Sequence, residues 1–147
     1  GIGKVLKHKL QVMQNKMMRF ILDLDSRAHI GHKEFSKTGF LNVETRVKQL
    51  KLGHVIKIIN KTCPYYLLTN FHKLSEFEDR IVTRDKANNF FKPRVSTDTF
   101  TYTAINDYND LPNKIKEIQN EITFKKTLKK HLLSEAGKVD LKLYMYY

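Results

Sequence analysis

Four lysines stand close together in the stretch LPNKIKEIQNEITFKKTLKKHLL, which covers residues 111–133: Lys125, Lys126, Lys129 and Lys130. Residues four apart are neighbours on a helix, so Lys125 meets Lys129 and Lys126 meets Lys130. Each such like-charge pair costs roughly 0.2–0.5 kcal/mol. Contact with an anionic partner would offset that cost. The alternative is an ordinary solvated helix face.

The sequence holds no motif for catalysis or for a metal site. A P-loop, a G-x-G-x-x-G turn, a G-x-S-x-G elbow and an H-E-x-x-H pair are all absent. His29 and His32 stand close together in an expected loop, and Cys63 is the only thiol that could join them. Asp23 and Asp25 follow a helix, where such residues usually form turns. We therefore expect neither catalysis nor a metal ion in this chain.

Charge and composition point to a folded protein with an anionic partner. The 147 residues carry 27 Lys and Arg against 15 Asp and Glu, a net charge of +12. A balance this basic favours nucleic acid or an acidic membrane surface. The excess lies in residues 1–61 and 111–147, while the middle is nearly neutral. A single cysteine suits a reducing compartment. No apolar run approaches the roughly 20 residues that span a bilayer. Because the chain begins at Gly1 in a helical pattern, we expect a fragment of a longer protein.

An amphipathic helix is predicted for the first segment, KVLKHKLQVMQNKMMRFILD. Its apolar residues recur with a period near 3.6 and form a stripe that we expect to pack into the core. The members of this stripe are Leu6, Leu10, Met13, Met17, Phe20 and Ile21. Lys9, Lys16 and Arg19 fall largely away from it. The opening GIGKVLKHKL resembles cationic membrane-active peptides, but core packing is favoured over a membrane surface because so much patterned chain follows.

Helices are also predicted further along the chain. A short helix runs up to Lys37 and stops at Gly39, and Asn42 caps a longer helix that we expect to be the most buried. The apolar positions of that helix are Val47, Leu50, Val55, Ile58 and Ile59. After Pro64, residues 65–68 are expected to pack as a turn or short helix.

The remaining segments are mixed. The stretch FFKPRV is apolar enough for an edge strand, and FTYTAINDYNDL is predicted to begin as a strand and continue as a helical turn. In the last helix, Phe124, Leu128 and Leu132 form one stripe, with the four lysines opposite. The expected fold is mainly α: a small helical bundle with a short irregular or β-containing insertion near residues 88–105.

Taken together, these motifs resemble a known family. The order LQVMQNKMMRFIL, TGFLNVETRVKQLKLGHVIKIINKTCPYYL, VTR, FFKPRVSTDTFTYTAINDYNDLP and IKEIQNEITFKKTLKKHL is similar to the region after the polymerase core in reverse transcriptases of LINE-like, non-LTR retrotransposons. The resemblance runs from about Leu10 to Leu133. Its matched positions are Arg46, Lys57, Pro64, Tyr66, Leu67, Pro93, Arg94, Phe100, Tyr102, Asn109, Leu111, Pro112, Phe124, Lys125, Leu128 and Lys129. Tyr108 stands where the family usually has tryptophan.

The resemblance implies a non-catalytic part of an RNA-directed DNA polymerase. Residues 1–68 would be a thumb-like helical region, 69–110 a connector, and 111–147 a basic C-terminal helix and tail. The palm motif Tyr-x-Asp-Asp is absent, so this chain alone should not polymerise DNA, and a divalent metal would belong to the palm. The implied partners are RNA, DNA or their hybrid and the upstream polymerase core of the same polyprotein, with no membrane. A nuclear location follows from the resemblance alone.

A thumb holds a template and primer duplex by its backbone, so the expected site consists of cations that contact phosphates. The candidates are Lys9, Lys16, Arg19, Arg46, Lys57, Arg84, Arg94, Lys125, Lys126, Lys129 and Lys130. For Arg46 and Arg94, an ion pair or a stacking contact within the fold is an equal alternative. A different function is also open: a scaffold module whose apolar helix faces dock on the polymerase core without binding nucleic acid.

Overall fold

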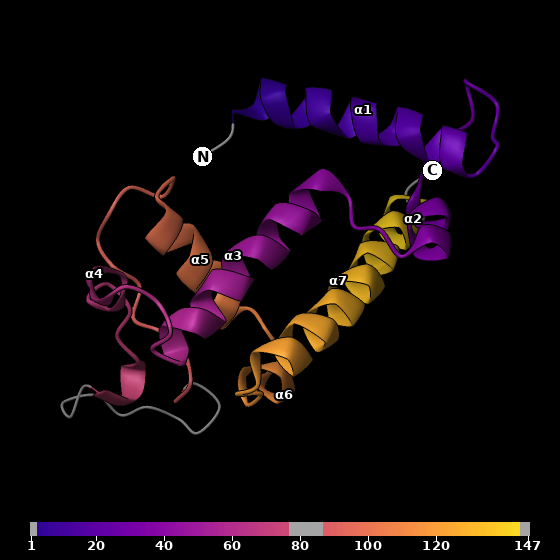
Figure 1. The fold of residues 1–147 in the computed structure, drawn as a ribbon. Coiled ribbons are helices and arrows are strands. Elements are labelled where there is room, and N and C mark those ends of the chain that lie inside the picture. The colour runs from indigo at the N-terminus through magenta and orange to yellow at the C-terminus, as the bar shows by residue number, and fades with distance from the viewer. Residues whose placement is uncertain (1–2, 77–86, 145–147) are drawn as a thin grey trace. The chain divides into compact units, whose positions relative to one another are not determined.

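The computed structural model describes residues 3–76 and 87–144, with side chains described up to residue 136 of the last helix (Figure 1). Within that part the chain forms seven α helices and no strand. The helices are α1 (Lys4–Ile21), α2 (His32–Thr38), α3 (Val43–Ile59), α4 (Tyr65–Leu68), α5 (Phe100–Asn109), α6 (Asn113–Lys116) and α7 (Glu121–Tyr144), with a 3-10 turn η1 at Leu74–Glu76. The predicted mainly α fold is confirmed.

The chain divides into two compact units. The central unit comprises Lys48–Thr127, and the terminal unit comprises Ile2–Val47 together with Leu128–Tyr147. The three regions expected from the resemblance, 1–68, 69–110 and 111–147, are a functional division and stay a prediction.

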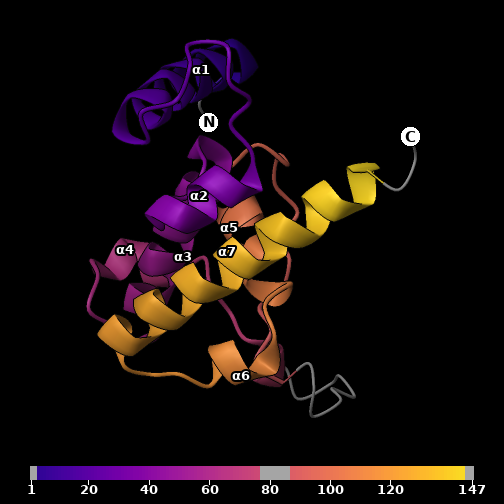
Figure 2. The same cartoon turned by 90° about the vertical axis from the view of Figure 1, so that its right-hand side faces the viewer.

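The core of the central unit forms between α3 and α5, which lie side by side in both ribbon views (Figure 2). Leu52 and Val55 of α3 and Ile105 of α5 are fully buried. At the edge of this contact, the Asp107 carboxylate forms ion pairs with the Nζ atoms of Lys51 at 2.6 Å and Lys48 at 3.7 Å. As predicted, α3 is the most buried helix whose side chains are described. However, Leu50 is 51% exposed, and the buried stripe contains Gln49 and Gly53 instead.

A buried aromatic cluster closes the other side of α5. Tyr108 lies with its ring centroid 5.0 Å from that of Phe90, and Phe90 meets Phe71 edge to face at 5.6 Å. All three are buried, Tyr108 to 1% exposure. The Asn109 side chain donates to the Phe90 carbonyl at 2.9 Å and accepts from its N–H at 2.8 Å. An amide side chain thus pairs with the backbone as a neighbouring strand would.

Two strand predictions were wrong. The stretch FFKPRV, residues 90–95, forms no strand: Phe90 makes only an isolated antiparallel bridge with Lys73, and residues 91–99 are irregular. FTYTAINDYNDL is helical from its first residue, because the Thr99 hydroxyl caps α5 by accepting from the N–H of Tyr102. The insertion expected near residues 88–105 is therefore irregular up to the start of α5.

The terminal unit holds α1 by its polar side. The side-chain amide of Gln14 donates to the Leu41 carbonyl at 2.8 Å, and Gln11 accepts from the N–H of Val43 at 2.9 Å. Met18 is the only buried residue of α1 among those described. The Thr38 hydroxyl lies 3.7 Å from its sulfur.

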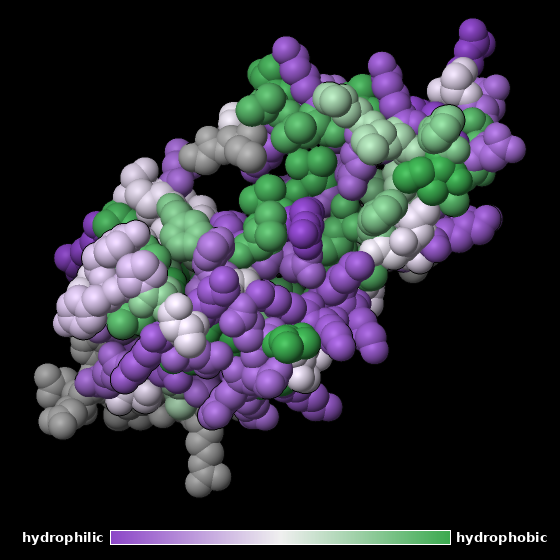
Figure 3. Space-filling model, viewed as in Figure 1, coloured by the Kyte–Doolittle hydropathy of each residue, from purple (hydrophilic) through white to green (hydrophobic). Residues whose placement is uncertain are grey.

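The prediction that the apolar stripe of α1 packs into the core was wrong. All six of its residues are exposed, from 38% at Leu10 to 89% at Phe20. Figure 3 shows hydrophobic side chains gathered over this helix. We call these six residues the α1 stripe. The helix is amphipathic, but its polar side faces its own unit and its apolar side faces outward.

The predicted caps of α2 and α3 are present. Gly39 ends α2 with φ 67°, a left-handed conformation that glycine adopts without strain. The Asn42 side chain accepts from the N–H of Thr45 at 2.8 Å and so caps α3. In the described residues, no helix is both long and apolar enough to cross a membrane.

Candidate nucleic-acid interface

The basic face of α7 follows directly from how this helix packs. Asn120 caps its start by accepting from the N–H of Thr123 at 3.0 Å. Phe124 is then buried in the central unit, and Leu128 and Leu132 are buried in the terminal unit. These three residues lie four apart and occupy one side of the helix. Lys125, Lys126, Lys129 and Lys130 therefore project from the other side, and all four are exposed.

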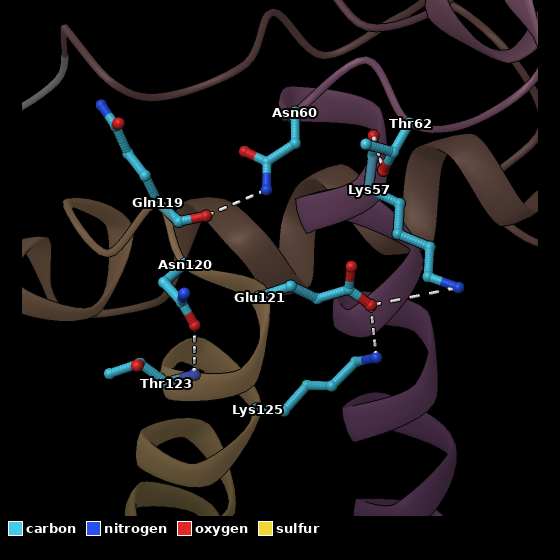
Figure 4. Close-up of polar contacts among 8 residues, drawn as sticks. All are labelled: Lys57, Asn60, Thr62, Gln119, Asn120, Glu121, Thr123 and Lys125. Carbon is cyan, nitrogen blue, oxygen red and sulfur yellow. Dashed lines mark hydrogen bonds and ion pairs between the residues drawn. The ribbon is translucent and has the colours of Figure 1, made fainter.

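The start of α7 packs against the end of α3 within the central unit (Figure 4). Asn60 donates from its side-chain amide to the Gln119 carbonyl at 2.9 Å. A Cβ added at Gly53 would lie 3.6 Å from the Cε atom of Lys125, so the stem of this lysine crosses α3 at its glycine. This packing brings together two candidates far apart in the sequence, Lys57 and Lys125.

Glu121 lies between those two lysines. Its Oε1 atom is 2.5 Å from the Nζ of Lys125 and 4.0 Å from the Nζ of Lys57 (Figure 4). The hydrogen bond from Lys125 lowers the pKa of Glu121 below its ordinary value, and the charges of Lys125 and Lys57 act in the same direction. The carboxylate is therefore ionised at neutral pH, and the three groups together carry one net positive charge.

The other three candidate lysines of α7 have no such partner in the part of the chain that the structure describes. Among the described residues, no acidic side chain forms an ion pair with Lys126, Lys129 or Lys130. We call these three residues the α7 lysine row. They lie one helical turn or less apart, so their ammonium groups can reach successive phosphates of one nucleic-acid strand.

The structure places the remaining candidates in different settings. On α1, Lys9 and Lys16 are exposed, whereas Arg19 donates through Nε to the Ala28 carbonyl at 2.8 Å. Arg46 is exposed on the first turns of α3, and Arg94 is exposed in the irregular segment before α5. Arg84 lies outside the described residues. Among the candidates that the structure describes, the contacts in the central unit join only Lys57 and Lys125.

Several lysines that the sequence did not single out turn out to be structural. Lys48 and Lys51 share Asp107. Lys116 donates to the side-chain oxygen of Asn89 at 2.8 Å and to the Asn109 carbonyl at 2.7 Å. Desolvation lowers the pKa of Lys116, against the opposing charge of Asp110. No sequence signal pairs residues this far apart, so these lysines could not be separated from the binding candidates beforehand.

The short helix expected at residues 65–68 is present as α4, but the prediction that Tyr65 and Tyr66 pack was wrong. Their exposed fractions are 78% and 69%. Two exposed aromatic residues side by side are a feature that sequence reasoning missed.

Within the described residues, no three His, Cys, Asp or Glu side chains gather closely enough to hold a metal ion. Comparison of the chain with models of protein families, with curated proteins and with solved structures found no match.

Proposed function

We propose that this chain binds RNA, DNA or an RNA/DNA hybrid through the phosphate backbone, with α7 as the main contact. The observation that carries the proposal is the α7 lysine row: three exposed cations that have no acidic partner among the described residues, on a helix whose opposite side is buried. Phosphate contacts of this kind fix a duplex in place but do not identify its sequence. The net charge of +12 supports the same class of partner.

The resemblance to the region after a retrotransposon polymerase core extends this proposal. In that setting the chain is the non-catalytic thumb and connector of an RNA-directed DNA polymerase in the nucleus. It grips template and primer, while polymerisation and its divalent metal belong to the palm. Lys9, Lys16, Arg19, Arg46, Lys57, Arg84 and Arg94 are then secondary phosphate contacts.

The test is fluorescence anisotropy with a labelled RNA/DNA hybrid hairpin over a series of salt concentrations. One variant changes Lys125, Lys126, Lys129 and Lys130 to Gln. A control variant removes the same charge elsewhere by changing the exposed residues Lys33, Lys37, Lys92 and Lys114 to Gln. Each lost phosphate contact lowers the slope of log K against log salt by about 0.9. We expect the slope of log K against log salt to become less steep by about three in the α7 variant and by much less in the control variant. Equal slopes in both variants would contradict the proposal.

A second candidate function is favoured by the α1 stripe. Six exposed apolar residues on one helix exceed what scattered surface hydrophobics explain, and such patches usually mark a protein contact. In this case the chain is a scaffold module that docks on the upstream polymerase core by this face. A second copy is a poor occupant, because α1 carries five basic residues and no acidic one.

The two functions separate by their salt dependence. Docking through apolar side chains depends weakly on salt, whereas phosphate binding falls steeply with it. The docking test measures binding of the polymerase core of the same polyprotein to this chain by calorimetry. Changing Met13, Met17 and Phe20 to Gln should abolish that binding and leave hybrid binding intact. If core binding survives these changes, the α1 stripe is not the docking face.

A further inference from the structure

The corner between α3 and α4 presents two tyrosine rings to solvent. Tyr65 and Tyr66 directly follow Pro64, which precedes the first turn of α4. They are 78% and 69% exposed, and neither side chain has a ring or hydrogen-bond partner among the described residues. The Tyr66 carbonyl accepts from the Thr69 hydroxyl at 3.0 Å, which leaves the ring itself unoccupied. The chain's other aromatic residues include the buried cluster around Tyr108. Within the described residues, the two tyrosine side chains therefore contribute no ring contact or hydrogen bond to the fold.

The same corner also holds a lysine, Lys61, in an uncommon backbone conformation. After α3, the N–H of Thr62 donates to the Lys57 carbonyl at 2.9 Å, and the N–H of Lys61 donates to the Ile58 carbonyl at 3.0 Å. This pair of bonds is a Schellman motif, whose left-handed residue is usually glycine. Here that residue is Lys61, with φ 55°. A non-glycine residue in this conformation is a strained choice, and such choices gather at functional positions.

The end of α3, from which this corner begins, is bonded to the start of α7. Asn60, next to Lys61, is bonded to Gln119, and Lys57 shares Glu121 with Lys125. All of these residues lie in the central unit. No acidic residue occurs from Lys57 to Tyr66. This part of the central unit thus presents the exposed residues Lys61 and Lys125 as well as two exposed tyrosines. Lysines and aromatic rings together are the combination that binds single-stranded nucleic acid in other proteins.

We propose that Tyr65 and Tyr66 stack on unpaired bases of a strand that extends beyond a duplex contacted by the lysines of the central unit. This inference rests on the proposed nucleic-acid function and names its substrate more narrowly: a duplex with a single-stranded overhang. Every base has a face that can stack, so the platform tolerates any overhang sequence. The lysines contact phosphates and the tyrosines contact bases, which distinguishes a tailed duplex from a blunt one.

The experiment compares three probes in anisotropy titrations at one salt concentration: a blunt hybrid duplex, the same duplex with an overhang, and the overhang strand alone. The overhang contains 2-aminopurine, whose fluorescence is quenched by stacking. The wild-type chain should bind the tailed duplex roughly five- to a hundredfold more tightly than the blunt one. Changing Tyr65 and Tyr66 to Ala should remove this preference and the quenching but leave blunt-duplex affinity unchanged. Changing both to Phe should preserve the preference.

A control variant changes Phe20, an equally exposed aromatic residue on α1, to Ala, and it should behave as wild type. The inference is overturned if the wild-type chain binds blunt and tailed duplexes equally, or if the alanine variant keeps its preference. Failure of the proposed function looks different: the blunt duplex is then not bound. In that case, tyrosine-dependent quenching with the overhang strand alone still supports the stacking platform, and its absence overturns the platform too.

Discussion

The Asn109 side chain bonds to both backbone groups of Phe90, donating to its carbonyl and accepting from its N–H. One side chain thereby holds the irregular segment before α5 against the end of that helix. The pair is partly buried, so neither backbone group of Phe90 would readily find water in its place. A carboxamide is needed, because only it offers a donor and an acceptor at this spacing.

Asn109→Asp should therefore destabilise the central unit by about 1–3 kcal/mol. The carboxylate can still accept from Phe90 but cannot donate to its carbonyl, and it brings a negative charge to that oxygen. Urea denaturation monitored by circular dichroism measures the change. Asn120→Asp is the matched control, since aspartate caps a helix as well as asparagine does. Equal stability of the two variants would show that the Phe90 contact contributes nothing.

Because Tyr108 is buried, we expect the folded protein to lose stability at alkaline pH. Burial raises the pKa of Tyr108 to about 12, whereas an unfolded tyrosine ionises near pH 10. Because the folded pKa is the higher one, the contribution of the neutral ring is complete below pH ~10 and is lost as pH rises through ~12. The loss is on the order of 2–3 kcal/mol. Urea denaturation at pH 9 and pH 12 gives the free energy of unfolding at each pH. The difference between the two should be smaller by this amount in Tyr108→Phe than in the wild type. An identical pH dependence in both chains would refute the assignment.

The two adjacent methionines of α1 should respond in opposite ways to truncation. Met18 is 1% exposed and Met17 is 63% exposed. Met18→Ala leaves a cavity and should cost about 2–4 kcal/mol, while Met17→Ala should change stability by less than about 0.5 kcal/mol. Thermal unfolding of both variants measures the difference. A large cost at Met17 would mean that the α1 stripe is covered within the chain after all.

Gly53 offers a stabilising change. It lies inside α3, and the only atom near an added Cβ is the Cε of Lys125 at 3.6 Å, an ordinary contact. Gly53→Ala should raise stability by about 0.5–1 kcal/mol, because alanine loses less backbone entropy in a helix. Gly39→Ala should lower it by about 1 kcal/mol, since φ there is positive. Chemical denaturation of the two variants side by side compares them. Destabilisation at Gly53 would indicate that the Lys125 stem cannot move aside.

Glu121→Gln should strengthen nucleic-acid binding. The change removes the carboxylate that holds Lys57 and Lys125 and leaves both cations to contact phosphates. We expect hybrid affinity to rise about two- to fivefold at low salt. Glu44→Gln makes the same change of charge at an exposed position on α3 and should have a smaller effect. If the two variants bind alike, only net charge matters and this lysine pair is not at the interface.

Sequence reasoning succeeded where spacing alone decides the outcome. Phe124, Leu128 and Leu132 stand four apart, and a helix with that spacing must bury one side and expose its lysines. The same reasoning recognised α1 as amphipathic but assigned the wrong side to the core. Periodicity defines two sides of a helix and does not say which one has a partner. Gln11 and Gln14 decided it, through hydrogen bonds to a loop 32 and 27 residues away.

Long-range pairs explain the other errors. A strand was expected at residues 90–95, but the backbone of Phe90 pairs with the Asn109 side chain of α5 instead. No local sequence pattern reveals this pairing. Lys57 and Lys125 were both proposed as phosphate contacts. Glu121 is four residues before Lys125 on the same helix, but its contact with Lys57 emerges only when α3 meets α7. Tyr65 and Tyr66 were assigned to packing because aromatic residues usually are buried. Their exposure depends on neighbours elsewhere in the fold.

Glu121 also changes how Lys57 and Lys125 would bind a phosphate. A phosphate that takes Lys57 or Lys125 must first displace a carboxylate already in place, so the step is an exchange between two anions. The released carboxylate then attracts a cation from solution, and that uptake cancels part of the gain from cations leaving the nucleic acid. The α7 lysine row, which has no acidic partner among the described residues, would incur no such uptake. The four neighbouring lysines carry equal formal charge but would bind phosphate differently. Lys125 would exchange the Glu121 carboxylate for a phosphate, whereas Lys126, Lys129 and Lys130 would gain a phosphate without losing a carboxylate.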